Sequence, residues 1–329
     1  MKNTLQYLLL ILSISLIYSC RKDQVPTITT SKVTSIMLTT ASGGGTITDE
    51  GSGTVLKRGV CWSINTIPTT NDNKTEDGGG GGTFTSNLTG LDKATTYRVR
   101  AYATNSAGTG YGKQLKFATL FLVGTPVTDI DGNTYKTVII GSQEWMAENL
   151  KTTKYNDGSS IPLVTDNNTW AALTAPGYCW YDNDEASYRN TYGALYNWFA
   201  VNTNKLCPVG WHVPSDEEWH ELISYVDPFS YSEVSYIGGG KLKESGTTHW
   251  DYPNDGATNE TGFTALPGGD RYNDYYNSET FWGIGTFSDM WSSTEADTLN
   301  AIGQQIYVNM IYLFYGHKQD GYSVRCLRD

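Results

Sequence analysis

Residues 213–226 read VPSDEEWHELISYV, and this stretch decides how the second half of the chain folds. Ser215 and Glu218 stand at the spacing of a capping box, in which each side chain accepts a hydrogen bond from the other residue's backbone N–H. Apolar residues then recur on one helical face, at Trp219, Leu222, Ile223 and Val226. The pattern predicts an amphipathic helix that begins near Ser215 and buries one face in a core.

A second short helix is predicted over residues 193–201 (GALYNWFAV), where apolar residues fall at helical spacing. Glu217 and Glu218 of the longer helix could be taken for a catalytic pair. They lie in its first turn, where the helix dipole stabilises carboxylates, so we interpret them as structural.

The composition of the whole chain favours short strands. The 329 residues include 35 Gly, and 13% of them are aromatic. Glycine reaches the positive φ angles of tight turns, and aromatic side chains provide apolar surface for cores. The formal net charge is −11. Because negative charge repels phosphate, we expect no nucleic-acid partner.

The first twenty residues have the organisation of an export signal. Lys2 precedes an apolar stretch at 8–17 (LLLILSISLI), which is shorter than the ~20 apolar residues of a membrane span. Ser19 and Cys20 follow, as in a lipobox. We expect residues 1–19 to be a lipoprotein signal peptide, Cys20 to be lipidated, and residues 20–26 to form a tether. The alternative is an ordinary secretory signal in which Cys20 is incidental.

This interpretation sets the expected location and the first expected partner. The lipid on Cys20 would anchor the protein to the bacterial outer membrane, facing the periplasm or the exterior. Such a compartment permits disulfides among the other cysteines, which are Cys61, Cys179, Cys207 and Cys326. Four cysteines allow three complete pairings, and the residues alone do not choose among them.

Residues 27–119 contain alternating stretches separated by Gly, Asn, Asp and Ser clusters, which is typical of a β-sandwich. The expected strands are 35–38, 57–62, 84–88, 96–104 and 115–119. The segment 88–102 (LTGLDKATTYRVRAY) resembles the corner that leads into strand F of a fibronectin type III domain. The resemblance implies a spacer or adhesion module.

The rest of the chain carries an ordered series of motifs. Residues 127–135 (VTDIDGNTY) predict two strands joined at an Asp-Gly turn. The further motifs are WMAENL at 145–150, YGALYNW at 192–198, CPVGWHVP at 207–214, GFTALPGG at 262–269, WSSTE at 291–295 and GYSVRC at 321–326. Over residues 127–329 the series resembles the Fibrobacter succinogenes major paralogous domain, a bacterial surface module. It is also similar to the C-type-lectin-like fold, especially its sulfatase-modifying-factor branch.

These resemblances imply a mostly β architecture. A fibronectin type III-like β-sandwich is expected at 27–119, a linker at 120–126, and an α+β, C-type-lectin-like domain with two short helices at 127–329. In lectin-like folds the terminal strand returns beside an early element, which implies a disulfide between Cys207 and Cys326. Cys61 and Cys179 lie in different modules, so they are expected to be unpaired and buried.

No catalytic motif is recognisable. A formylglycine-generating oxidase needs paired reactive cysteines in the C-terminal half, whereas the end of this module offers only Cys326. The four histidines are scattered and are not spaced as zinc or iron ligands. Elements like those of calcium-dependent lectins occur only in reverse order. We therefore expect no enzymatic activity, no metal and no cofactor.

The remaining candidate feature is an aromatic surface. Residues 271–287 and 305–317 are crowded with Tyr, Phe and Trp among small polar residues. Tyr and Trp give rigid contact area with a polar tip, which suits stacking on sugars or protein contacts. The predicted ligand-binding face consists of Tyr272, Tyr275, Tyr276, Trp282 and Tyr312. The expected function is that of an anchored envelope lipoprotein, structural or binding, with a glycan or protein as ligand; the alternative for the rings is that they fill the core.

The competing hypothesis is an enzyme that acts on envelope or extracellular glycans through a carboxylate pair. The candidate carboxylates are Asp182, Asp184, Asp270 and Asp274. A glycosidase needs two carboxylates at a defined separation, so two acids facing each other across a deep cleft would favour this hypothesis.

Overall fold

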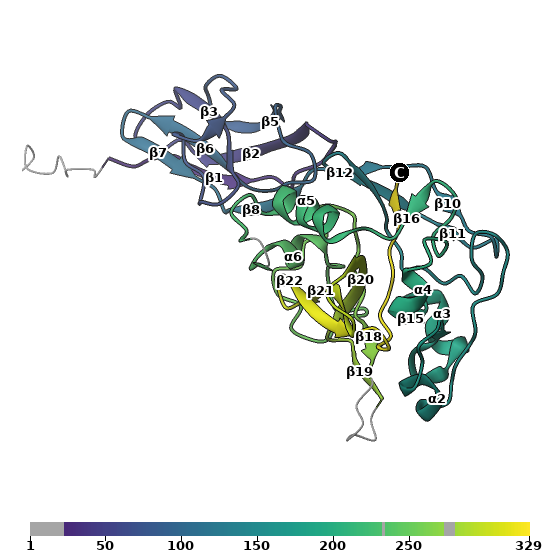
Figure 1. Ribbon diagram of the computed structural model, residues 1–329. Coiled ribbons are helices and arrows are strands. Elements are labelled where there is room, and N and C mark those ends of the chain that lie inside the picture. Colours follow the sequence, from purple (N-terminus) through teal and green to yellow (C-terminus); the bar gives the residue numbers. More distant parts are fainter. Residues whose placement is uncertain (1–22, 232–233, 273–279) are drawn as a thin grey trace, which may run out of the picture. The chain divides into compact units, whose positions relative to one another are not determined.

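The computed structural model describes residues 23–231, 234–272 and 280–329, and the chain divides into two compact units. The first unit comprises the chain up to Leu91 together with Thr96–Thr119, and the second comprises Asp92–Thr95 and Leu120–Asp329. Figure 1 labels their elements. Cys20 lies outside the described residues. Within the described residues, no helix is both long enough and apolar enough to cross a membrane.

The first unit is a β-sandwich, and its described residues, from 23 onward, form eight strands. They are β1 (Thr27–Thr30), β2 (Ala41–Asp49), β3 (Lys57–Ser63), β4 (Asn73–Lys74), β5 (Gly82–Leu88), β6 (Thr96–Asn105), β7 (Gly108–Tyr111) and β8 (Leu115–Ala118). One sheet has the order β1-β2-β5, and the other has the order β4-β3-β6-β7 with β8 also paired to β6. The predicted fibronectin type III-like sandwich is confirmed.

The core of the first unit lies between its two sheets. Val60, Leu88 and Ala101 are completely buried there. Gly45 of β2 faces Ala101 of β6, and a Cβ on Gly45 would lie only 2.6 Å from the Cβ of Ala101. Glycine at this position therefore allows the two sheets to approach closely.

The predicted strand at 35–38 was wrong, and four strands, β1, β2, β4 and β7, were missed. Ser35 has a positive φ of 47°, which interrupts extended backbone. The missed strand β2 begins ASGGG, so its first half lacks the apolar alternation that identifies strands. Strands β1 and β7 are short, with four residues each.

The second unit combines short strands with five α-helices among its described residues. The strands are β9 (Leu122–Val123), β10 (Val127–Thr128), β11 (Thr134–Tyr135), β12 (Thr137–Ile140), β13 (Gln143–Met146), β14 (Tyr178–Cys179), β15 (Leu195–Tyr196), β16 (Trp211–His212), β17 (Val234–Ser235), β18 (Gly268–Arg271), β19 (Phe281–Ile284), β20 (Ser288–Glu295), β21 (Asn300–Tyr307), β22 (Met310–His317) and β23 (Leu327–Arg328). The helices are α2 (Asn167–Ala171), α3 (Glu185–Tyr192), α4 (Trp198–Val201), α5 (Asp216–Val226) and α6 (Gly238–Leu242), with a 3-10 turn η1 at Tyr181–Asn183.

Two sheets organise this unit. One has the order β16-β23-β13-β12-β9, and the other, β17-β22-β21-β20, is flanked by α5 and α6 (Figure 1). The predicted hairpin at 127–135 is present as β10 paired with β11. Leu122 and Val123 were expected to belong to a linker at 120–126. They form instead the edge strand β9, because their backbones pair with Val138 and Ile139 of β12.

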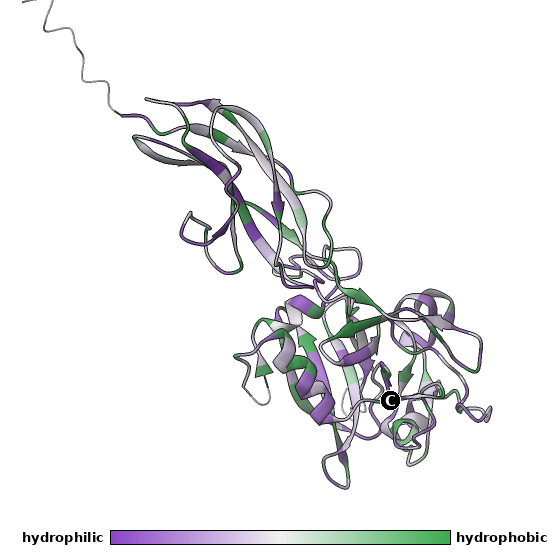
Figure 2. Cartoon of the chain, turned by 90° about the horizontal axis from the view of Figure 1, so that it is seen from above, coloured by the Kyte–Doolittle hydropathy of each residue, from purple (hydrophilic) through white to green (hydrophobic). Residues whose placement is uncertain are grey.

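The helix predicted from the capping box is confirmed as α5. Ser215 caps it, the reciprocal bond from Glu218 is present, and Trp219, Leu222, Ile223 and Val226 are all buried. Helix ribbons in Figure 2 carry both purple and green segments, as amphipathic helices do. The carboxylate of Glu218 accepts the backbone N–H of Ser215 at 2.7 Å, which supports the structural interpretation of this residue.

The helix predicted at 193–201 was mostly wrong. Gly193 ends α3 with a positive φ of 77°, residues 195–196 form β15, and only Trp198–Val201 are helical. Asn197 starts that helix, because its side-chain oxygen accepts the N–H of Ala200 at 3.1 Å. The described part of the second unit contains five α-helices where two were expected. Helix α3 was missed, although Asp184 is its N-cap.

The predicted disulfide is confirmed. Cys207 and Cys326 are bonded with a Cα–Cα distance of 5.9 Å, and both are buried. Cys61 and Cys179 are free and buried, also as predicted. Burial raises the pKa of each of these two thiols to about 11, so neither is a reactive thiolate near neutral pH.

Candidate ligand-binding site

The hairpin β18–β19 carries the residues of the predicted aromatic face. Asp270 pairs with Trp282 and Arg271 pairs with Phe281 across the two strands. Because side chains alternate between the faces of a strand, Asp270, Tyr272 and Trp282 share one face of the hairpin. Arg271 and Phe281 share the other.

Arg271 fixes the inner face of this hairpin. It is completely buried, and it donates hydrogen bonds to the carbonyls of Val164 and Thr165 and to the side chain of Asn167. Its guanidinium group also lies 4.4 Å from the ring centre of Trp170. These contacts of Arg271 hold the hairpin in one orientation. The opposite face, with Asp270, Tyr272 and Trp282, therefore has a fixed position.

A polar row crosses the neighbouring sheet. Asp289 of β20 stands opposite Gln305 of β21, and Gln305 stands opposite Tyr312 of β22. The Nε2 group of Gln305 donates to Oδ1 of Asp289 at 2.7 Å, and the hydroxyl of Tyr312 donates to Oε1 of Gln305. The amide of Gln305 therefore links the tyrosine to the acid.

Asp270 joins the hairpin to this row. Its carboxyl group lies beside that of Asp289, and both residues are almost completely buried. If both groups were ionised, neither could donate a hydrogen bond to the other. Gln305 donates to Oδ1 of Asp289, and the other three carboxyl oxygens accept no hydrogen bond from a donor group. Burial raises the pKa of both groups, and the charge of Asp289 raises that of Asp270 further. Asp270 therefore keeps its proton, and this proton can be donated to the carboxylate of Asp289.

Two phenols lie beside this acid pair. Burial raises the pKa of Tyr272, and its acidic neighbours Asp270 and Asp289 raise it further. Burial followed by the charge of Asp289 likewise raises the pKa of Tyr312. Both hydroxyls remain protonated donors at neutral pH. We call Asp270, Asp289, Gln305, Tyr272, Tyr312 and Trp282 the acid–tyrosine site.

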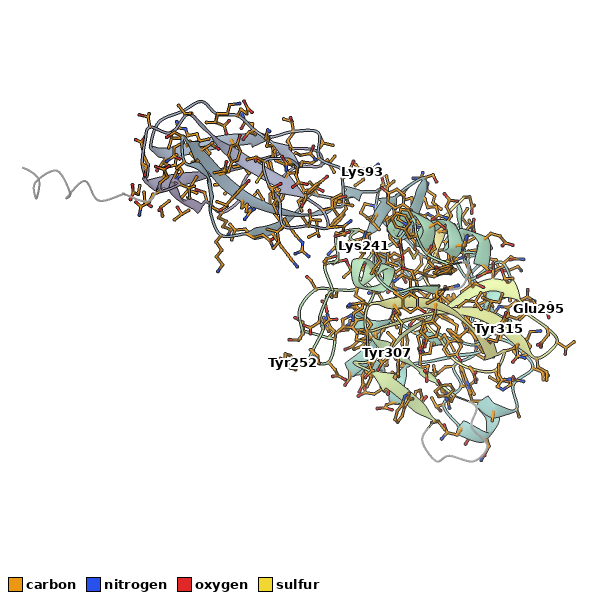
Figure 3. All side chains as sticks on the ribbon, turned by 90° about the vertical axis from the view of Figure 1, so that its left-hand side faces the viewer. Lys93, Lys241, Tyr252, Glu295, Tyr307 and Tyr315 are labelled. Carbon is orange, nitrogen blue, oxygen red and sulfur yellow. A yellow bond between two sulfur atoms is a disulfide. The ribbon has the colours of Figure 1, made fainter. Side chains whose placement is uncertain are left out.

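The rings of this site are only partly covered. Trp282 is 53% exposed, Tyr272 is 41% exposed and Tyr312 is half-buried. Tyr315 is also exposed, but it stands three residues from Tyr312 and so on the other face of β22. In Figure 3 Tyr315 lies near Glu295, away from Tyr307 at the other end of the sheet. Tyr315 is therefore a surface tyrosine outside the site.

Three of the five predicted ligand-face residues are thus described. Tyr272 and Tyr312 converge on the acid pair, and Trp282 stands on the same hairpin face. Tyr275 and Tyr276, and also Asp274, lie outside the described residues. Sequence reasoning missed Asp289 and Gln305. Asp289 directly precedes the buried Met290 and Trp291, and this position inside a strand was the available signal.

The two other described candidate carboxylates, Asp182 and Asp184, lie in the turn before helix α3 and at the start of that helix. Asp184 is the N-cap of α3, and its carboxylate accepts the N–H of Ser187 at 3.1 Å. Asp182 lies in the 3-10 turn before it, with a φ of 50°. Within the described part of the chain, no three His, Cys, Asp or Glu side chains gather as ligands for a metal ion.

A known protein family matches most of the second unit. Residues 138–328 match the model of the Fibrobacter succinogenes major domain. The chain belongs to this family. The Fibrobacter succinogenes major domain thus includes both β18–β19 and the sheet β17-β22-β21-β20, and the acid–tyrosine site lies within it. No curated protein matches the chain.

Two of the solved structures that are similar to this chain each cover less than a third of it. The sensor domain of the anti-sigma factor RsgI4 in Pseudobacteroides cellulosolvens is 17% identical, covers 29% of this chain and 76% of its own, and has a TM-score of 0.23. The third fibronectin III domain of human KIAA0343 protein is 15% identical, covers 31% and 88%, and has a TM-score of 0.22.

Proposed function

We propose that the protein is an exported, lipid-anchored binding protein whose Fibrobacter succinogenes major domain recognises a glycan through the acid–tyrosine site. The observation that carries the proposal is the half-exposed Trp282 and Tyr272 beside a row of polar groups. Aromatic rings stack on the apolar faces of sugar rings, and phenol hydroxyls and amides bond to sugar hydroxyls. The fibronectin type III-like unit acts as the spacer.

The contact between the two acids supports binding over glycoside hydrolysis. Glycosidase carboxylates stand about 5 to 9.5 Å apart with room for substrate or water between them. Asp270 and Asp289 instead lie side by side and are at most 1% exposed, so neither faces an open cleft. Their role in this proposal is to hold the hairpin on the sheet and to orient Gln305.

A glycan-array experiment with the purified chain tests the proposal. The probes are immobilised oligosaccharides and bacterial envelope polysaccharides. Trp282→Ala should weaken binding by about tenfold, which corresponds to about 1.4 kcal/mol. Tyr272→Phe, which removes one hydroxyl, should weaken it less.

Tyr315→Ala is the matched control, because Tyr315 is equally aromatic and exposed but stands on the other face of β22. The control should bind as the unchanged chain does. The proposal fails if no glycan binds, or if Trp282→Ala and Tyr315→Ala have the same effect.

The proposed lipid anchor rests on the apolar stretch 8–17 that ends at Ser19 and Cys20. Cys20→Ser should release the protein from membranes into the soluble fraction, because the acyl chains provide the anchoring free energy. Fractionation of cells that express each form decides this. A Cys20→Ser chain that still requires detergent would overturn the anchor.

A further inference from the structure

A second site is indicated by a pocket that shares no residue with the acid–tyrosine site. Its volume is about 590 Å³, within the range of pockets that hold small molecules. The turn after β13, the end of α3 and the loop between α6 and β18 all contribute to its lining. The pocket lies entirely within the second unit.

Buried hydrogen bonds hold one wall of this pocket. Asn149 is buried, and its Nδ2 group donates to the carbonyl of Tyr192 at 2.9 Å and to Oγ of Ser323 at 3.1 Å. Arg325 donates from Nε to Oδ1 of Asn149 and from Nη2 to the carbonyl of Thr264. Two lining residues, Asn149 and Thr264, are therefore fixed by one buried arginine, so the wall is preformed.

An apolar part of the lining consists of Phe121, Val123, Ala147 and Leu266. The ring of Phe121 lies against Gly262, where a Cβ would come within 2.4 Å of it. Gly262 also has a φ of 74°, a conformation that favours glycine. This glycine lets the aromatic ring form a wall, which provides space for an apolar group of a ligand.

The charged part of the lining contains both signs. The lysines are Lys136 and Lys151, and the carboxylates are Glu148 and Glu244. The carboxylate of Glu244 is hydrogen-bonded to Nδ1 of His249 at 2.9 Å, and the carboxylate of Glu148 accepts a hydrogen bond from the backbone N–H of Lys136 at 3.1 Å. Within the described residues, neither lysine ammonium forms a salt bridge, and neither does the carboxylate of Glu148. Lys151 Nζ lies 5.9 Å from the ring centre of Tyr135, and the charge of Glu148 acts on the buried Arg325, but an ion of opposite sign can still pair with each of the three groups.

We propose that this pocket binds a small zwitterion, an amino acid or a short peptide with an apolar side chain. Its ammonium group would pair with Glu148, and its carboxylate would pair with Lys151 or Lys136. The apolar side chain would lie against Phe121 and Leu266. Both charges of such a ligand are met by opposite charges on the lining, and its apolar part loses contact with water.

Calorimetric titration of the full chain tests this inference. The probe is the dipeptide Phe-Leu, and the matched probe is N-acetyl-Phe-Leu-amide, which has the same side chains and neither terminal charge. Phe-Leu should bind, and blocking both charges should weaken binding by more than about tenfold. Equal binding of both probes, or no binding of Phe-Leu at millimolar concentration, would overturn the inference.

Variants locate the binding. Glu148→Gln keeps an acceptor for the N–H of Lys136 but removes the charge, and Lys151→Met keeps the length of the side chain. Each should weaken Phe-Leu binding by about tenfold, whereas Glu217→Gln on the exposed side of α5 should not. Thermal melting confirms that each variant is folded. Trp282→Ala should leave Phe-Leu binding unchanged, and a loss there with none in Glu148→Gln would assign the peptide to the acid–tyrosine site instead.

Discussion

The two units of this chain are stabilised in different ways. In the first, β3 and β6 pair in unbroken register from Lys57 and Thr104 to Ser63 and Arg98, and the apolar residues form one cluster. In the second, many strands have only two residues, and the interior contains completely buried arginines. The comparison teaches that ladder hydrogen bonds and apolar alternation specify the first unit, whereas individual polar side chains and a disulfide specify the second.

The largest expected effect that separates the units comes from the disulfide. Replacing both Cys207 and Cys326 by Ala should destabilise the second unit by about 5 kcal/mol, because the bond closes a loop of more than a hundred residues in the unfolded chain. Hydrogen exchange read by mass spectrometry follows each unit separately. Protection in the first unit should not change. Equal loss of protection in both units would contradict the different stabilisation of the two units. Cys61→Ala, which removes a free thiol from the first unit, is the control.

A matched pair of substitutions to methionine sharpens the comparison. Arg325→Met removes the donors to Asn149 and to the carbonyls of Phe263 and Thr264, which should cost the second unit about 3 kcal/mol or more. Leu88→Met in the core of the first unit conserves volume and should cost less than about 1.5 kcal/mol. Denaturant unfolding measures both. Similar costs would show that the second unit depends on its polar interior no more than the first does.

The smallest effect concerns pH and the pair Asp270 and Asp289. Both pKa values are raised above the ordinary 3.8, so below that value each carboxyl is protonated in the folded and the unfolded chain. As pH rises from about 4 through the folded pKa values, the unfolded chain releases its protons first. The stability of the second unit should therefore fall with rising pH.

Asp270→Asn tests this dependence, because an amide donates to Asp289 without a titrating proton. At pH 8 the variant should be more stable than the unchanged chain by about 1 kcal/mol or more, and at pH 4 it should show no gain. Melting curves across this range are the measurement. Asp255→Asn, at an exposed position, should show no gain at either pH. A variant that is less stable at both pH values would contradict the shared proton.

Features that depend on neighbouring residues could be predicted from the sequence, whereas features that depend on distant residues could not. In α5, the cap and the buried stripe lie within fourteen consecutive residues, so local spacing was sufficient. Strand β2 could not be found, because its glycines are explained by residues far away in the sequence: Gly43 faces Leu88 and Val60, Gly44 faces the backbone of Phe84, and Gly45 faces Ala101. In the candidate site, the exposed rings of Tyr272 and Trp282 follow from local composition. The partnership of Asp270 with Asp289 depends on how the hairpin packs on the sheet, which no local pattern encodes.

The position of β23 has a consequence for the order of folding. This strand lies inside its sheet, between β16 and β13, and pairs Leu327 with Trp145. Such contacts join residues far apart in sequence and form slowly, because a long loop must close first. The meander β20-β21-β22 requires only short loops. Pulsed hydrogen exchange should therefore show protection in the meander before β13, so that insertion of β23 completes the second unit and brings Cys326 to Cys207.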